Sequence, residues 1–80
     1  MSIASFSKPS DADVLQKMES NGKFLNFVGK GVVLQNMNET RYIRTIKIIV
    51  DQEEVLQNVV YVKLGINWFF KKTETVLLNT

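Results

Sequence analysis

The stretch TRYIRTIKIIV at residues 40–50 constrains the fold of this chain more than any other segment, because β-branched residues recur along its whole length. Such residues favour an extended backbone, so we predict a β-strand here. Strict alternation gives one apolar face, made of Tyr42, Ile46, Ile48 and Val50. The other face is wetter and mixes Ile43 and Ile49 with Arg41, Thr45 and Lys47. This pattern is typical of an antiparallel strand.

A single helix is predicted at residues 11–20. Ser10 can cap it, and Asp13 stands where a capping box has an acid. Val14, Leu15 and Met18 then form a narrow apolar stripe, and Asn21-Gly22 supplies a helix end. Residues 1–9 have no periodic pattern, so we expect an N-terminal arm followed by one small globular domain at residues 10–80.

The rest of the chain reads as short strands. KFLNFV and VVLQNM flank a Gly-Lys-Gly and predict a hairpin, as do INWFFKK and TVLLN near the C-terminus. Residues 52–64 are ambiguous: their valines favour a strand, whereas Asp51, Glu54 and Gly65 could delimit a second helix.

The predicted fold class is therefore α+β, with one N-terminal helix followed by an antiparallel meander of five or six short strands. Such a sheet either curls into a small barrel or packs the helix across one face. Apolar residues also fall on the nominal outer side, namely Ile43, Ile49, Val59 and Phe69. Their exposure favours curling or a dimer, since either would cover them.

Composition argues against catalysis. The 80 residues include no histidine and no cysteine, so the usual general base and the thiol nucleophile are both missing. Asp51, Glu53 and Glu54 form the main acidic cluster, which we interpret as a solvated turn rather than a metal site. We expect no enzyme activity, no cofactor and no bound metal.

One face of the predicted sheet combines aromatic rings with cations. If every strand alternates strictly, this candidate binding surface consists of Arg41, Lys47, Tyr61, Lys63, Phe69 and Lys71. Single-stranded nucleic-acid binders use such a combination, in which bases stack on rings and cations follow the backbone. The same residues also suit half-buried packing with solubilising lysines. Trp68 is expected in the core with its apolar neighbours on the same face.

The sequence thus predicts a small non-enzymatic interaction protein that binds another protein or itself as a homodimer, through unpaired strand edges. Its size suits an accessory or regulatory protein of the viral or phage type. The alternative is binding of single-stranded nucleic acid through the basic-aromatic face. Net charge is only +2, which does not by itself argue for a polyanionic partner. Without a bilayer-spanning apolar run or cysteines, we expect no membrane partner and a cytoplasmic location.

Overall fold

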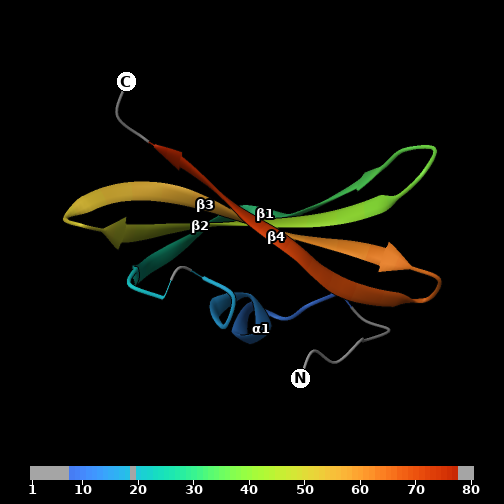
Figure 1. The fold of residues 1–80 in the computed structure, drawn as a ribbon, viewed down its shortest axis with the longest axis horizontal. Helices are drawn as coiled ribbons and strands as arrows, with labels where there is room; N and C mark the ends of the chain where they lie inside the picture. Colours follow the sequence, from blue (N-terminus) through green and yellow to red (C-terminus); the bar gives the residue numbers. More distant parts are fainter. Residues whose placement is uncertain (1–7, 19, 78–80) are drawn as a thin grey trace.

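The computed structural model describes residues 8–18 and 20–77, which form one short helix and one four-stranded sheet. In chain order the elements are α1 (Asp11–Leu15), β1 (Lys23–Gln35), β2 (Thr40–Val50), β3 (Glu53–Leu64) and β4 (Asn67–Leu77). Each strand pairs antiparallel with the next one, so the sheet is a meander in the order β1-β2-β3-β4 (Figure 1). The predicted antiparallel meander is confirmed, but the expectation of five or six short strands is wrong.

The Gly-Lys-Gly segment does not reverse the chain, because β1 runs through it as one bent strand. Gly29 has φ 63°, and the register against β2 shifts between Val28 and Val32. Gly31 lies against Tyr42: a Cβ there would stand 2.2 Å from the Tyr42 hydroxyl oxygen. Gly29 therefore permits the irregularity in β1, and Gly31 permits the close approach of the Tyr42 ring. The prediction of a hairpin turn at this segment is wrong.

The predicted C-terminal hairpin is also absent, since β4 continues through Lys71 and Lys72. A register irregularity there leaves Lys71 without a residue opposite it on β3. The chain reverses instead at the β1–β2 turn, residues 36–39, and at two tight turns, Asp51-Gln52 and Gly65-Ile66. Within residues 52–64, ambiguous in sequence, Glu53–Leu64 form β3 rather than a second helix.

Helix α1 begins with the predicted capping box. The Asp13 N–H donates to the Ser10 hydroxyl at 3.2 Å, and the Ser10 N–H donates to the Asp13 carboxylate at 3.1 Å. The helix ends at Leu15, well short of the predicted residue 20. Of the predicted N-terminal arm, residues 1–7 lie outside the described residues, while the Lys8 ammonium lies 5.7 Å from the centre of the Tyr42 ring.

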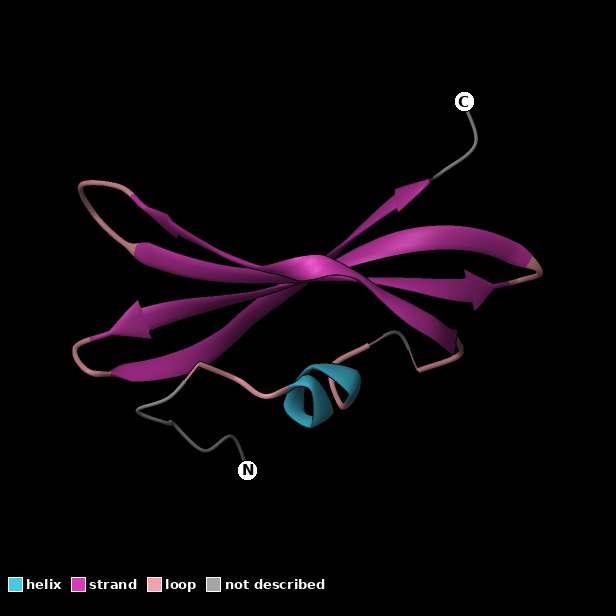
Figure 2. Cartoon of the chain, turned by 180° about the vertical axis from the view of Figure 1, so that it is seen from behind, coloured by secondary structure: helices cyan, strands magenta, loops and turns pink. Residues whose placement is uncertain are grey.

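Helix α1 packs across one face of the sheet and creates the core there (Figure 2). The buried apolar residues of this layer are Val14, Tyr42, Ile46, Ile48, Val55, Val59, Tyr61 and Trp68. Within the described residues no element covers the opposite face, and the shortest extent of the molecule is 17 Å. Of the two predicted arrangements, the helix on one face is observed, whereas the barrel is not: β1 and β4 remain the unpaired edges.

Arg44 is a buried cation in this layer that the sequence pattern did not single out. Its guanidinium donates to the Gly29 carbonyl at 2.6 Å and to the Asp11 carboxylate at 3.3 Å. It also lies 4.5 Å from the centre of the Phe27 ring. Arg44 thereby links α1 to the irregular part of β1 through contacts that compensate its burial.

Candidate interaction surface

The two tight turns decide which side chains share a face of the sheet. Val50 lies opposite Glu53 across the β2–β3 turn, so even-numbered residues of β2 neighbour odd-numbered residues of β3. Leu64 likewise lies opposite Asn67 across the β3–β4 turn. The predicted surface grouped odd-numbered residues of every strand on one face. In the structure, odd-numbered residues of β2 and β3 lie on opposite faces, although side chains alternate along each strand.

The structure does not bring the six predicted surface residues onto one face. Tyr61 is opposite Tyr42 in the core and only 4% exposed, and Lys63 shares that face, with its ammonium 5.9 Å from the centre of the Trp68 ring. Arg41, Lys47 and Phe69 belong to the uncovered face, and Lys71 sits at the β4 irregularity. The six residues therefore do not form the predicted basic-aromatic face. Across each two-residue turn, an even-numbered residue of one strand lies opposite an odd-numbered residue of the next.

Other face assignments change for the same reason. Trp68 is 7% exposed in the core, as predicted. The apolar neighbours expected on its face include Val60, Val62 and Leu64, which instead belong to the opposite face of β3, where Val62 lies opposite Phe69 and Val60 is fully buried. Val59, expected on the outer side, is fully buried in the core.

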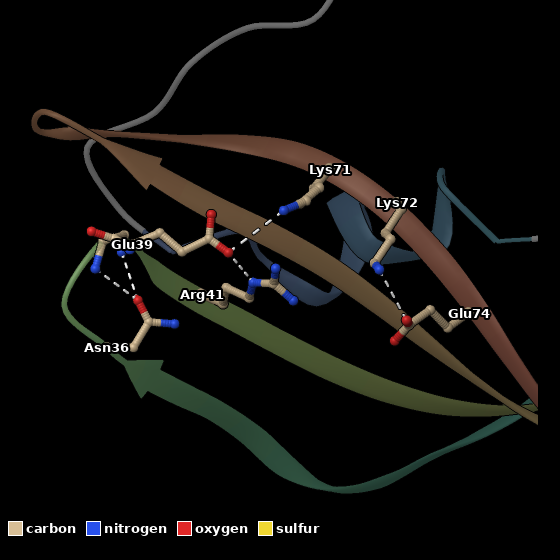
Figure 3. A network of polar contacts seen from close by, with 7 residues as sticks. Asn36, Glu39, Arg41, Lys71, Lys72 and Glu74 are labelled. Carbon is tan, nitrogen blue, oxygen red and sulfur yellow. Dashed lines mark hydrogen bonds and ion pairs between the residues drawn. The ribbon is translucent and has the colours of Figure 1, made fainter.

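Four cations of β2 and β4 lie beside carboxylates. Glu39 lies between Arg41 and Lys71, with the Lys71 ammonium at 3.5 Å (Figure 3). Hydrogen bonding from Arg41 is the main cause that holds the pKa of Glu39 below its ordinary value. Lys47 lies 3.8 Å from Glu54, and Lys72 lies 3.0 Å from Glu74. This local neutralisation leaves a surface poorly suited to following a phosphate backbone.

Exposed aliphatic side chains are the feature that distinguishes this surface. Val32, Val33 and Leu34 of β1 are 49%, 42% and 50% exposed. Other large exposed apolar residues include Leu25, Leu64, Ile66 and Val76. We refer to the uncovered face, together with this part of β1, as the outer surface. The sequence did carry a signal for β1, because no charged residue occurs between Lys30 and Glu39.

The acidic residues near the β2–β3 turn do not gather into a ligand set. Asp51 forms the turn itself, with φ 52°, and Glu54 pairs with Lys47. Among the residues that the structure describes, no group of three or more acidic, cysteine or histidine side chains is arranged to hold a metal ion. Over the same residues, no helix combines the length and the apolar character required to cross a bilayer.

Comparison with known protein families, with curated proteins and with solved structures finds no match to this chain.

Proposed function

We propose that this chain is a non-enzymatic protein-binding module that uses its outer surface to contact an apolar surface of another protein. The observation that carries the proposal is the uncovered sheet face with its exposed aliphatic residues. Antiparallel sheets that face water on one side normally place polar residues there, and exposed apolar surface of this kind marks interaction sites. The proposal assigns no cofactor and no catalytic step to the chain.

The charge pattern supports a protein partner over a nucleic acid. Arg41, Lys47 and Lys71 each stand beside a carboxylate, and Tyr61 is buried away from them. A nucleic-acid surface needs accessible rings and cations that are free to release counterions. The absence of cysteine suits a reducing compartment, so we place the interaction in the cytoplasm.

The test compares the native chain with a double variant on the outer surface, Leu64→Lys with Phe69→Lys. The matched control is Gln16→Lys with Asn21→Lys, at exposed positions in and after the turn that follows α1. Immobilised native protein and control should retain the same protein from nuclease-treated native lysate, and the outer-surface variant should lose it. Purified partner must then bind the native chain directly. Thermal melts establish that all three proteins are folded.

The same preparations are titrated with labelled single-stranded DNA and RNA, with anisotropy as the readout. Flat anisotropy at low salt agrees with the proposal. Salt-sensitive oligonucleotide binding together with no retained protein would overturn the proposal in favour of the nucleic-acid alternative. Retention of the partner by the outer-surface variant would overturn the location of the site.

A further inference from the structure

The two edge strands of the sheet differ in how they are protected. On β1, the segment from Gly31 to Gln35 has aliphatic side chains at its three middle positions and no charge. On β4, Lys71, Lys72 and Glu74 occupy the central part, and the register irregularity falls among them. Charges and irregularities are the devices that prevent edge strands from pairing with other chains. The β1 segment lacks charges and, beyond the irregularity that ends at Val32, pairs regularly with β2 as far as Gln35, so it is the edge open to strand addition.

Hydrogen bonding in the β1–β2 turn shows which backbone groups of this edge point outward. The Asn36 N–H donates to the Glu39 carbonyl at 3.0 Å, which makes this pair a hydrogen-bonded one. Hydrogen-bonded and non-hydrogen-bonded pairs alternate along an antiparallel ladder. Gln35 and Val33, opposite Thr40 and Tyr42, therefore direct their N–H and C=O groups away from β2. These groups are available to a further strand.

We propose that the strand added at this edge is the same segment of a second copy, paired antiparallel about Val33. Val33 then faces Val33 of the other copy, and Val32 faces Leu34. The inference rests on the proposed function and specifies one partner of the outer surface. The two four-stranded sheets become one continuous sheet, related by a two-fold axis.

Charge and side-chain complementarity favour a second copy as the occupant. In this register Lys30 faces Asn36 of the other copy, so no like charges meet along the segment. Aliphatic and β-branched side chains face one another across the new ladder, which stabilises antiparallel pairs. Each copy also supplies its outward Val33 N–H to the Val33 carbonyl of the other, so both polar groups gain a partner.

Charge substitutions at the two-fold position provide the test. V33K alone and V33E alone should each weaken self-association, measured by sedimentation velocity, by about tenfold or more. An equimolar mixture of the two should restore it, because opposite charges then meet at the axis. The matched control is the Gln16→Lys with Asn21→Lys variant, at exposed positions away from the outer surface. This variant should associate like the native chain.

Amide hydrogen exchange provides a second readout that requires no variant. Dilution should speed exchange of the Val33 amide and leave the Leu34 amide, which points toward β2, unchanged. A native chain that is monomeric at every concentration, a V33K chain that associates normally, or a mixture without restoration would each overturn the dimer. If such a monomer still retains a protein that the Leu64 and Phe69 double variant loses, only the dimer fails and the proposed function stands.

Discussion

Tyr61 places a hydroxyl inside the apolar layer between α1 and the sheet. The residue is 4% exposed, and its hydroxyl has no hydrogen-bond partner among the described residues. Burial raises the pKa of Tyr61 to about 12, with smaller contributions from Asp13 and Tyr42. Since the folded state holds this proton more tightly than the unfolded state, the stabilisation is present below the ordinary pKa of 10.0 and is lost as pH rises toward 12.

Replacing Tyr61 with phenylalanine removes the unsatisfied hydroxyl and keeps the ring. We expect Tyr61→Phe to raise the free energy of unfolding by about 1 kcal/mol at neutral pH. The variant should also lose less stability than the native chain between neutral pH and about pH 11. Urea unfolding followed by Trp68 emission measures both effects. A variant less stable than the native chain at neutral pH would mean that the hydroxyl has a favourable partner.

At the scale of elements, two glycines of β1 serve different purposes, and alanine substitutions separate them. Gly29 has open space for a Cβ but a positive φ of 63°, so Gly29→Ala should cost about 1 kcal/mol. Gly31→Ala should cost more, about 2–3 kcal/mol, because its Cβ would collide with the Tyr42 ring. A double-mutant cycle with Tyr42→Leu provides the control. Additive effects of the Gly31 and Tyr42 substitutions would contradict the contact.

The β2–β3 turn carries strain that a substitution can relieve. Asp51 and Gln52 both have positive φ, 52° and 67°, the conformation that hairpin turns of this kind normally give to asparagine and glycine. We expect Gln52→Gly to stabilise the fold by about 1 kcal/mol, since glycine adopts this backbone without a steric penalty. Thermal unfolding measures the change, with Gln35→Gly, an edge-strand substitution expected to destabilise, as the comparison. An unchanged or lower melting temperature for Gln52→Gly would contradict this account.

The elements themselves were predictable where one local pattern dominates. β2 occupies the predicted residues, and the Ser10–Asp13 capping box is present, because both depend on neighbouring residues alone. The continuity of β1 and β4 through their register irregularities was not predictable in this way. A glycine pair such as Gly29 and Gly31 suits a turn as well as a bulge, and the choice depends on Tyr42 from the next strand.

The six residues predicted to share one surface lie on different faces for a related reason. Tyr61 and Phe69 both alternate correctly along their own strands, yet they occupy opposite faces. Which face each strand presents follows from the length of the turn that precedes it. A change of one residue in that length exchanges the two sets of side chains. Local periodicity therefore identified the strands better than it identified the residues that share a surface.

At the scale of the whole molecule, the sheet and the helix are held by different interactions. β2 and β3 each have a hydrogen-bonded neighbour on both sides. Helix α1 contributes Val14 as its buried residue, and its ion pair with Arg44 involves an Asp11 side chain that is 59% exposed. Because the Asp11 side of this pair is exposed, solvent screens the interaction and the pair contributes little to holding the helix. Attachment of α1 therefore depends mainly on Val14, whereas the ladders hold the sheet together independently of the helix.

This difference predicts two separate opening reactions in native-state hydrogen exchange. The amides of Val14 and Gln16, which bond within the helix, should exchange through an opening of lower free energy and weaker urea dependence than the amides of β2 and β3. Val14→Ala should lower the free energy of both openings by about 1–3 kcal/mol. The free energy of the helix opening, which is the lower of the two, should therefore approach zero first. Gln16→Ala, exposed on the following turn, should change neither. Identical exchange energies and urea dependence in α1 and β2 would show that helix and sheet unfold as one unit.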